Sequence, residues 1–271
     1  MNETPFFFGQ PRQELFGVLH QPVDCSRSVG VVLCHPFGEE KLWSHRVFVS
    51  FARQAADAGY PVMRLDYYGN GDSDGNFEDS SVTRCLSDIA QAVDTLKART
   101  SVTSVALVGL RFGGLLASLC AEARHDVSSL VLWAPVVHGG RFVQEQLRIN
   151  VTTQMAAFRE IRLDREQLVA NLTSGGTANV DGYEMSRTMY EELSTVDLSS
   201  RLLTFSGRCL IVRIERGLAA KPAADVTTLA AKYPHAQVIE VEEEPFWREI
   251  DRFYGNAPQL CARTLEWLNA Q

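Results

Sequence analysis

The chain has 271 residues, of which 45% are hydrophobic and 22% are charged, and its formal net charge is −7. This length and composition suffice to bury the core of one large globular domain, and we expect a single domain over residues 1–271. The acidic balance, without a local run of Lys and Arg, excludes the basic surface that nucleic-acid binding requires.

Short apolar runs alternate with helical patterns along most of the chain. The amino-terminal segments FFFG and LFGVLHQP are expected to form an antiparallel hairpin at one edge of a sheet. The continuous apolar runs that follow are typical of strands buried on both faces. The expected strands are 29–35, 61–68, 104–110, 129–135, 208–214 and 237–243, and the expected helices are 47–60, 80–98, 111–123, 222–233 and 257–270. Repeated β-α units of this kind predict an α/β fold with a mostly parallel, doubly wound sheet.

Residues 138–200 interrupt this alternation. They hold a long helical stretch, a Gly-rich turn and a hairpin-like segment, NVDGYEMS. Long insertions at the carboxyl ends of strands commonly cover a functional site. We therefore expect an inserted cap at about 138–200, with a surface decoration as the alternative.

The amino terminus indicates where in the cell the protein is expected, and the cysteines indicate which cofactors are expected. The apolar run from Phe6 to Phe8 is too short for a signal peptide or a membrane-spanning helix, so a cytoplasmic protein is expected. The six cysteines form no CxxC pair, and Cys34 falls in an apolar segment that predicts a core position. We expect reduced thiols, no metal and no cofactor.

The first motif that bears on chemistry is Gly109-Leu110-Arg111-Phe112-Gly113-Gly114, which follows a strand and opens a helix. This is the context of the G-x-S-x-G nucleophile elbow. Its central residue occupies a strained turn, and the residues two positions away must be small so that strand and helix can approach. Both glycines are present here, but an arginine stands in place of the serine.

The second motif is Asp66-Tyr67-Tyr68-Gly69-Asn70-Gly71-Asp72-Ser73, which follows an early strand. It resembles the D-x-x-G-x-G-x-S loop of α/β-hydrolases, especially of their serine-aminopeptidase-like and lipase-like branch. The segment 35–38, His-Pro-Phe-Gly, stands where these relatives carry His-Gly at the oxyanion loop. The resemblance extends from about residue 12 to the end, and it implies an α/β-hydrolase fold and a hydrolase family.

A narrower resemblance rests on HPFGEEKLWSHR, on the GLRFGG elbow and on GGTANVDGYEMS. These segments are similar to the α/β-hydrolase-like proteins found with the exosortase/PEP-CTERM sorting system of bacteria, in which an arginine at the elbow is normal. The resemblance implies a partner role in surface-polysaccharide or protein-sorting pathways.

A serine hydrolase of this fold needs a serine, an acid and a histidine in that chain order. Arginine cannot replace the serine, because a guanidinium stays protonated and offers only donors. Glu215, just after the strand 208–214, occupies the expected position of the acid. No histidine follows His235, which precedes the last strand and is expected on the surface at the far end of the sheet. The triad is therefore predicted to be degenerate.

Other residues near the site suggest no nucleophile–base pair. His35 is expected to make a structural hydrogen bond to a neighbouring loop. His45 and His138 could either reach the mouth of the pocket or be solvated. Ser44 is interpreted as a helix cap and Ser73 as a turn residue.

Three hypotheses remain open for Arg111. It could form a structural ion pair with Glu39 or Glu40, because a buried charge needs a partner. It could instead help the backbone N–H groups of Phe37 and Phe112 to bind an anionic or acyl small molecule.

In the third hypothesis Arg111 stabilises an oxyanion while Glu39, Glu40 or Glu244 acts as a general base. The leading interpretation is a non-hydrolytic protein that binds a ligand or a protein partner, with ligand contacts from Arg111 and its neighbours and from His138. The alternative is an active carboxylic ester or thioester hydrolase that uses non-standard residues.

Overall fold

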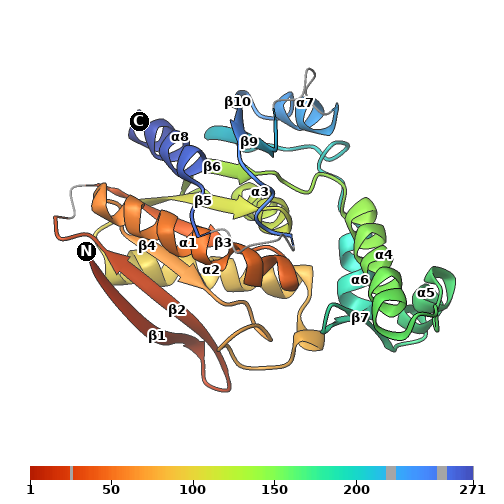
Figure 1. Cartoon of the computed structure of the whole chain (residues 1–271). Helices are drawn as coiled ribbons and strands as arrows, with labels where there is room; N and C mark the ends of the chain where they lie inside the picture. Colours follow the sequence, from red (N-terminus) through yellow and green to blue (C-terminus); the bar gives the residue numbers. More distant parts are fainter. Residues whose placement is uncertain (25–26, 218–223, 249–254, 271) are drawn as a thin grey trace.

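The architecture is built on an eight-stranded sheet in the order β1-β2-β4-β3-β5-β6-β9-β10 (Figure 1). The computed structural model of the chain describes residues 1–24, 27–217, 224–248 and 255–270. The strands of the sheet are β1 (Asn2–Gln10), β2 (Gln13–Gln21), β3 (Val29–Cys34), β4 (Val62–Leu65), β5 (Ser104–Leu110), β6 (Val127–Trp133), β9 (Arg208–Glu215) and β10 (His235–Glu242). The hairpin β1–β2 pairs antiparallel with β4 at one edge, and the other neighbours are parallel, as expected.

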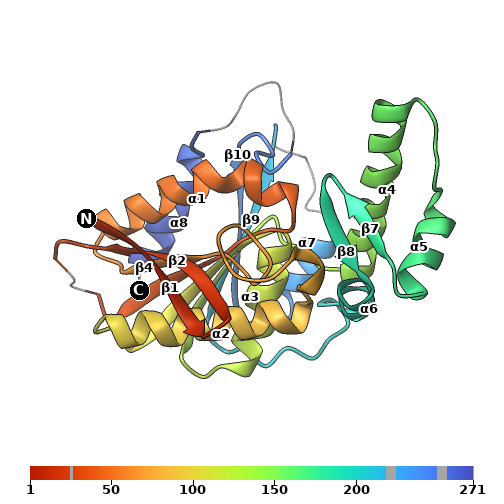
Figure 2. The ribbon, with the colours of Figure 1, turned by 90° about the horizontal axis from the view of Figure 1, so that it is seen from below.

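Helices cover both faces of the sheet. They are α1 (Glu39–Asp57), α2 (Val82–Arg99), α3 (Phe112–Ala123), α7 (Ala224–Ala230) and α8 (Pro258–Asn269), with a 3-10 turn η1 (Phe77–Asp79). Helices α1 and α8 lie on one face of the sheet, and α2 and α3 lie on the other (Figures 1 and 2). Each pair packs on its own hydrophobic cluster. Among the described helices, none combines the length and the apolar character needed to cross a bilayer.

The alternation of side chains along β3 explains its uninterrupted apolar sequence. Val31 and Leu33 belong to the cluster under α1 and α8, whereas Val32 and Cys34 belong to the cluster under α2 and α3. All four side chains are fully buried. A strand with both faces covered needs apolar residues at every position, which confirms the interpretation of this run.

Helix α1 begins at Glu39, eight residues earlier than the predicted start at residue 47. Gly38, with φ of 50°, makes the turn from β3 into the helix. Glu39 and Glu40 then occupy the first turn, where the helix dipole favours negative charge. The expectation that Ser44 caps a helix is wrong for this reason, since Ser44 lies buried within α1.

The segment between β6 and β9 forms a separate layer beside one end of the sheet (Figures 1 and 2). Its elements are α4 (Gly139–Phe158), α5 (Arg165–Thr173), β7 (Thr177–Val180), β8 (Tyr183–Ser186) and α6 (Arg187–Thr195). The strands β7 and β8 pair antiparallel, so the hairpin expected in NVDGYEMS is present. We call this segment the inserted segment.

The cysteines of the described residues are free and buried, as the apolar context of Cys34 predicted. Burial raises the pKa of the Cys34 thiol well above its ordinary value. The thiol therefore stays protonated, and it packs as a small apolar side chain. Cys25 lies outside the described residues.

Candidate functional site

The turn between β5 and α3 has the geometry of a nucleophile elbow. Arg111 is the residue that caps α3, with φ of 54° and ψ of −117°. Its N–H donates to the carbonyl oxygen of Trp133 at 3.0 Å, and its own carbonyl oxygen accepts from the N–H of Val136 at 3.1 Å. These bonds to the neighbouring strand and the segment after it hold the strained backbone in place.

The two glycines that flank the elbow are sterically required. A Cβ atom at Gly109 would overlap the backbone carbonyl of Gly113, and one at Gly113 would overlap the backbone carbonyl of Cys34. Neither neighbour is a flexible side chain that could move away. The structure thus confirms that small residues let strand and helix approach at this corner.

The guanidinium of Arg111 donates to two carboxylates. Its Nε lies 3.2 Å from Oε1 of Glu40, and its Nη2 lies 3.0 Å from Oε2 of Glu145. The other oxygen of Glu145 accepts from Nη2 of Arg248 at 3.2 Å. Of the two partners expected from the sequence, Glu40 forms the ion pair, whereas Glu39 bonds to Tyr183.

Sequence reasoning did not find Glu145, although a signal was present. Glu145 lies one helical turn after Phe142 on α4 and one turn before Ile149. Residues at this spacing share one face of a helix. Phe142 is buried against the aromatic ring of Phe112 at the elbow, so this face of α4 turns toward residue 111.

The ion pairs and the burial of the site shift the pKa values of Glu40 and Arg111 in opposite directions. Burial raises the pKa of Glu40 to about 7, although the Arg111 guanidinium acts to lower it. Burial acts to lower the pKa of Arg111, but Glu40 and Glu145 together hold it above its ordinary value. Arg111 therefore remains a cation, whereas Glu40 can exchange a proton near neutral pH.

A cavity of about 660 Å³ lies beside this network. Its walls come from α1 and the residues before it, from α4, from the end of β7 and the turn after it, and from the segment after β10. The lining residues are Phe37, Gly38, Glu39, Glu40, Trp43, Glu145, Gln146, Ile149, Val180, Asp181, Trp247 and Arg248. The cavity therefore combines aromatic and aliphatic side chains with charged groups, of which Glu40, Glu145 and Arg248 belong to the ion-pair network.

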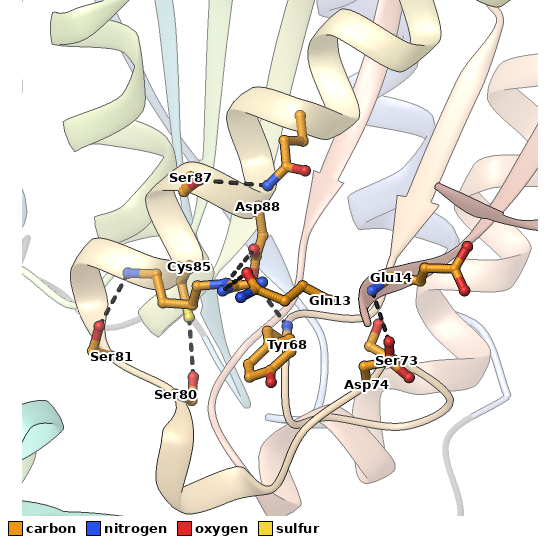
Figure 3. A network of polar contacts seen from close by, with 12 residues as sticks. Gln13, Glu14, Tyr68, Ser73, Asp74, Ser80, Ser81, Cys85, Ser87 and Asp88 are labelled. Atoms are coloured by element: carbon orange, nitrogen blue, oxygen red, sulfur yellow. Dashed lines mark hydrogen bonds and ion pairs between the residues drawn. The ribbon is translucent and has the colours of Figure 1, made fainter. Parts of the chain in front are cut away.

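The Asp- and Gly-rich loop after β4 is a structural element. The hydroxyl of Ser73 donates to the backbone oxygen of Asp66 at 2.7 Å, which confirms Ser73 as a turn residue. Figure 3 shows how neighbouring elements hold the loop: the Tyr68 N–H donates to Asp88 at 2.8 Å, and Asp74 accepts from the backbone at the start of β2. The side chains of Asp66, Ser73 and Asp74 are thus used within the fold.

Glu215 ends β9 at the carboxyl edge of the sheet, where the sequence placed the acid of a triad. Its carboxylate accepts from Nη2 of Arg213 at 2.6 Å. His235 is exposed at the first position of β10, at the opposite end of the strands, as expected. Glu215 therefore has an arginine partner in place of a histidine.

His138 does not line the large cavity beside the elbow. It lies between Asp197, 3.0 Å from its Nδ1, and Asp225, 3.2 Å from its Nε2. Together with Glu215 and Arg111 it lines a neighbouring cavity of about 340 Å³, and Glu145 lines both cavities. Within the described ranges, no three His, Cys, Asp or Glu side chains gather as metal ligands.

The other residues that the sequence suggested for the site lie apart from one another. His35 is buried and stacks on Phe48 with ring centroids 4.5 Å apart, and its Nδ1 has no hydrogen-bond partner among the described residues. The side chain of His45 is exposed on the outer face of α1. Glu244 pairs with Arg216 at 3.0 Å.

Comparison with known proteins identifies the family and the fold. The family described as Serine aminopeptidase, S33 matches residues 27–210. Human Protein ABHD12B is 30% identical over 109 residues, which are 39% of this chain but only 29% of that relative's length.

Solved structures resemble the chain over nearly its whole length. Est1E from Butyrivibrio proteoclasticus, bound to ferulic acid, has a TM-score of 0.70 at 19% identity, with 98% of each chain covered. Mouse alpha/beta hydrolase domain-containing protein 10 has a TM-score of 0.64 at 15% identity, over 98% of this chain and 99% of that one. At this level of identity the likeness concerns the fold alone, and it confirms the α/β-hydrolase fold expected from the sequence.

Proposed function

The chain belongs to the serine aminopeptidase, S33, family of α/β-hydrolases, and from this premise we propose that it retains a ligand pocket but not the serine-hydrolase reaction. The observation that carries the proposal is Arg111 at the elbow, paired with Glu40 and Glu145. A guanidinium that donates to two carboxylates can neither lose a proton nor attack a carbonyl carbon.

The cavity beside the elbow supports a binding function. Its volume of about 660 Å³ lies within the range of small-molecule sites, and Phe37, Trp43 and Trp247 contribute aromatic side chains to its wall. An anionic ligand at Arg111 would meet the carboxylates of Glu40 and Glu145, which already accept from Nε and Nη2. A neutral or acyl ligand fits this environment better than the anionic ligand considered from the sequence.

A fluorophosphonate probe and a panel of short-chain esters and thioesters test the proposal. Fluorophosphonates label activated serines, so we expect no labelling and no turnover above the uncatalysed rate. A known serine esterase in parallel samples provides the positive control. Labelling of the chain, together with turnover that the probe inhibits, would overturn the proposal.

A second candidate function is hydrolysis through water activated by Glu40. Its support is the pKa of Glu40, raised by burial to about 7 beside a cavity, a value suited to a general base. In this reaction Glu40 takes a proton from water, and the hydroxide adds to the ester carbonyl carbon. The bond from this carbon to the alkoxide oxygen then breaks, and Glu40 returns the proton to the leaving alkoxide. Turnover that is insensitive to fluorophosphonate and lost in Glu40→Gln would favour this candidate; turnover that survives in Glu40→Gln would exclude it.

We also propose a partner role in protein sorting or surface-polysaccharide export. Its support is the resemblance of HPFGEEKLWSHR, GLRFGG and GGTANVDGYEMS to proteins of the exosortase/PEP-CTERM system. Deletion of the gene in a bacterium that carries this system tests the role. Unchanged sorting and unchanged export in the deletion strain would exclude it.

A further inference from the structure

The exposed apolar side chains of the described residues concentrate at one end of the inserted segment. Ten large hydrophobic side chains of the described chain are exposed, and four of them fall within nine consecutive residues. These four are 43–52% exposed: Met155, Phe158, Ile161 and Leu163. They lie at the end of α4 and on the segment that leads to α5, at the outer end of the molecule (Figure 2). We call residues 155–165 the tip.

A buried glutamine holds the tip in shape. The side chain of Gln154 accepts from the N–H groups of Arg162 and Leu163 at 2.7 Å and 2.9 Å, and it donates to the carbonyl oxygen of Leu163 at 2.8 Å. The guanidinium carbon of Arg162 lies 3.6 Å from the centroid of the Phe158 ring. The segment after α4 is therefore folded back on the end of this helix, and the exposed apolar side chains belong to one ordered structure.

This grouping differs from the rest of the described surface. Single exposed apolar side chains are ordinary on proteins, whereas a group of them marks a contact with another molecule or with a membrane. The other six exposed residues are scattered over the described chain: Met1, Phe7, Val23, Leu42, Leu202 and Val238. The tip is accordingly the part of the described surface that indicates an apolar contact.

The acidic side chains at the tip are engaged within the fold. Glu160 accepts from Nε of Arg162 at 2.9 Å, so this pair is neutral as a whole. Asp164 caps α5 by accepting from the N–H of Gln167 at 2.9 Å, and Glu166 follows in the first turn of this helix. The positive end of the helix dipole partly offsets both of these charges.

Two arginines of the tip remain available to a partner. Arg159 and Arg165 are exposed, and the side chain of neither bonds to a described residue. A guanidinium suits phosphate groups, which it binds through two parallel donors. Apolar side chains flanked by such arginines are complementary to a membrane interface, where phosphates lie directly above acyl chains.

A second copy of the chain is less complementary to the tip. In a symmetric dimer the same patch of both copies would meet, so Arg159 and Arg165 of one copy would lie near those of the other. Like charges brought together at an interface oppose association. A layer of lipid phosphates offers the opposite charge.

We propose that the tip docks on the surface of a phospholipid membrane. Met155, Phe158, Ile161 and Leu163 enter the boundary between head groups and acyl chains, and the available arginines bind lipid phosphates. This inference goes beyond the proposed function and does not depend on it, because the tip lies outside the residues that line the large cavity.

Vesicle flotation of the full chain tests the inference. The probes are vesicles of phosphatidylcholine with about 30% phosphatidylglycerol and vesicles of phosphatidylcholine alone. At about 0.15 M salt, charges more than about 8 Å from the lipid surface are screened, so the arginines of the tip outweigh the net charge of −7 on the whole chain. We expect flotation with both vesicles, and at least about fivefold tighter binding to the anionic ones.

Variants of apolar residues assign the binding to the tip. Phe158→Ser and Ile161→Ser each remove an apolar side chain that enters the interface, and we expect each to weaken binding to both vesicles by about tenfold. Phe7→Ser is the matched control, because Phe7 is exposed to a similar extent, 54% against 49% for Phe158, but lies on β1. It should bind vesicles as the wild type does. Circular dichroism and Tm confirm that each variant is folded.

Variants of arginine assign the preference for anionic lipid. Arg159→Gln and Arg165→Gln should each weaken binding to the anionic vesicles by about fivefold. Arg263→Gln, on α8 and 55% exposed at the side chain, is the control and should leave this binding unchanged.

The outcomes distinguish the possible partners of the tip. Flotation with neither vesicle, equal affinity for the two vesicles, or equal binding by the wild type and by Phe158→Ser and Ile161→Ser would overturn the inference. A dimer in analytical ultracentrifugation that Phe158→Ser dissociates would also overturn it and would assign the tip to a second copy. Each of these results leaves the fluorophosphonate test of the proposed function unaffected.

Discussion

The Nη2 atom of Arg111 lies 3.0 Å from Oε2 of Glu145, and this contact joins the elbow of the sheet to helix α4 of the inserted segment. The same carboxylate accepts from Arg248 after β10, and the same guanidinium donates to Glu40 on α1. The residue at the nucleophile position is thus the centre of a charged network that connects four parts of the chain.

Arg111→Ala should be strongly destabilising. It leaves the carboxylate of Glu40, 13% exposed, without the cation that offsets its burial. We expect a loss of about 3–5 kcal/mol in the free energy of unfolding, measured by urea denaturation. Adding Glu40→Gln to this variant should recover part of the loss, because it removes the unpaired charge.

Arg141→Ala is the matched control for this prediction. Arg141 also pairs with a carboxylate, that of Asp225, but its side chain is 72% exposed. We expect a change below about 1 kcal/mol. Equal effects of Arg111→Ala and Arg141→Ala would show that the network at the elbow contributes no special stability.

Arg111→Ser should not create an esterase. The substitution restores a hydroxyl at a strained elbow, but Glu215 pairs with Arg213 and no histidine follows His235 in the sequence. A serine without a base is a poor nucleophile. Rates with p-nitrophenyl acetate should equal those of Arg111→Ala, and a serine-dependent burst of p-nitrophenol would contradict this prediction.

Glu40 should make the stability of the chain depend on pH. Its pKa is raised to about 7 in the folded protein from an ordinary value of 4.5, so the folded state holds this proton more tightly. The free energy of unfolding should therefore fall as pH rises from about 4.5 to about 7, by on the order of 3 kcal/mol at most, and then level off.

Urea denaturation of the wild type and of Glu40→Gln between pH 5 and pH 8 isolates this contribution. The variant lacks the titrating group but keeps the other carboxylates, so the difference between the two proteins removes the shared pH dependence. The wild type should lose stability relative to the variant as pH rises. A constant difference across this range would refute the prediction.

Gly113→Ala should be disruptive although it adds a single methyl group. The new Cβ would overlap the backbone carbonyl of Cys34, so α3 and β3 would have to separate. We expect a loss of about 3 kcal/mol, measured by urea denaturation. Gly255→Ala, where a Cβ meets no atom of a described residue within 4 Å, is the control and should change stability by less than about 0.5 kcal/mol.

The fold could be predicted from the sequence because its signals are local. The apolar runs at 29–35 and 104–110 became β3 and β5, and the G-x-x-x-G corner became the turn before α3. The sequence did not predict that α1 begins at Glu39. The charged residues around Trp43 interrupt the apolar periodicity of a helix, and Gly38 has no side chain that could signal a helix cap.

The site was only partly predictable. Glu40 follows the oxyanion loop directly, so its place near Arg111 follows from the order of the strands. Glu145 and Trp247 reach the same cavity from the inserted segment and from the segment after β10. The spacing of Phe142, Glu145 and Ile149 puts Glu145 on the apolar face of α4, but no local pattern of residues specifies where that face packs or how the segment after β10 returns to the sheet.

The close contacts at Gly109 and Gly113 involve main-chain atoms, so we expect the corner to keep its shape when the side chain of residue 111 is exchanged. The backbone of this protein is accordingly a preformed scaffold for enzyme design. A designer who wished to install acyl-transfer chemistry would exchange side chains at positions 111 and 215 and introduce a histidine beyond β10, without altering the course of the main chain.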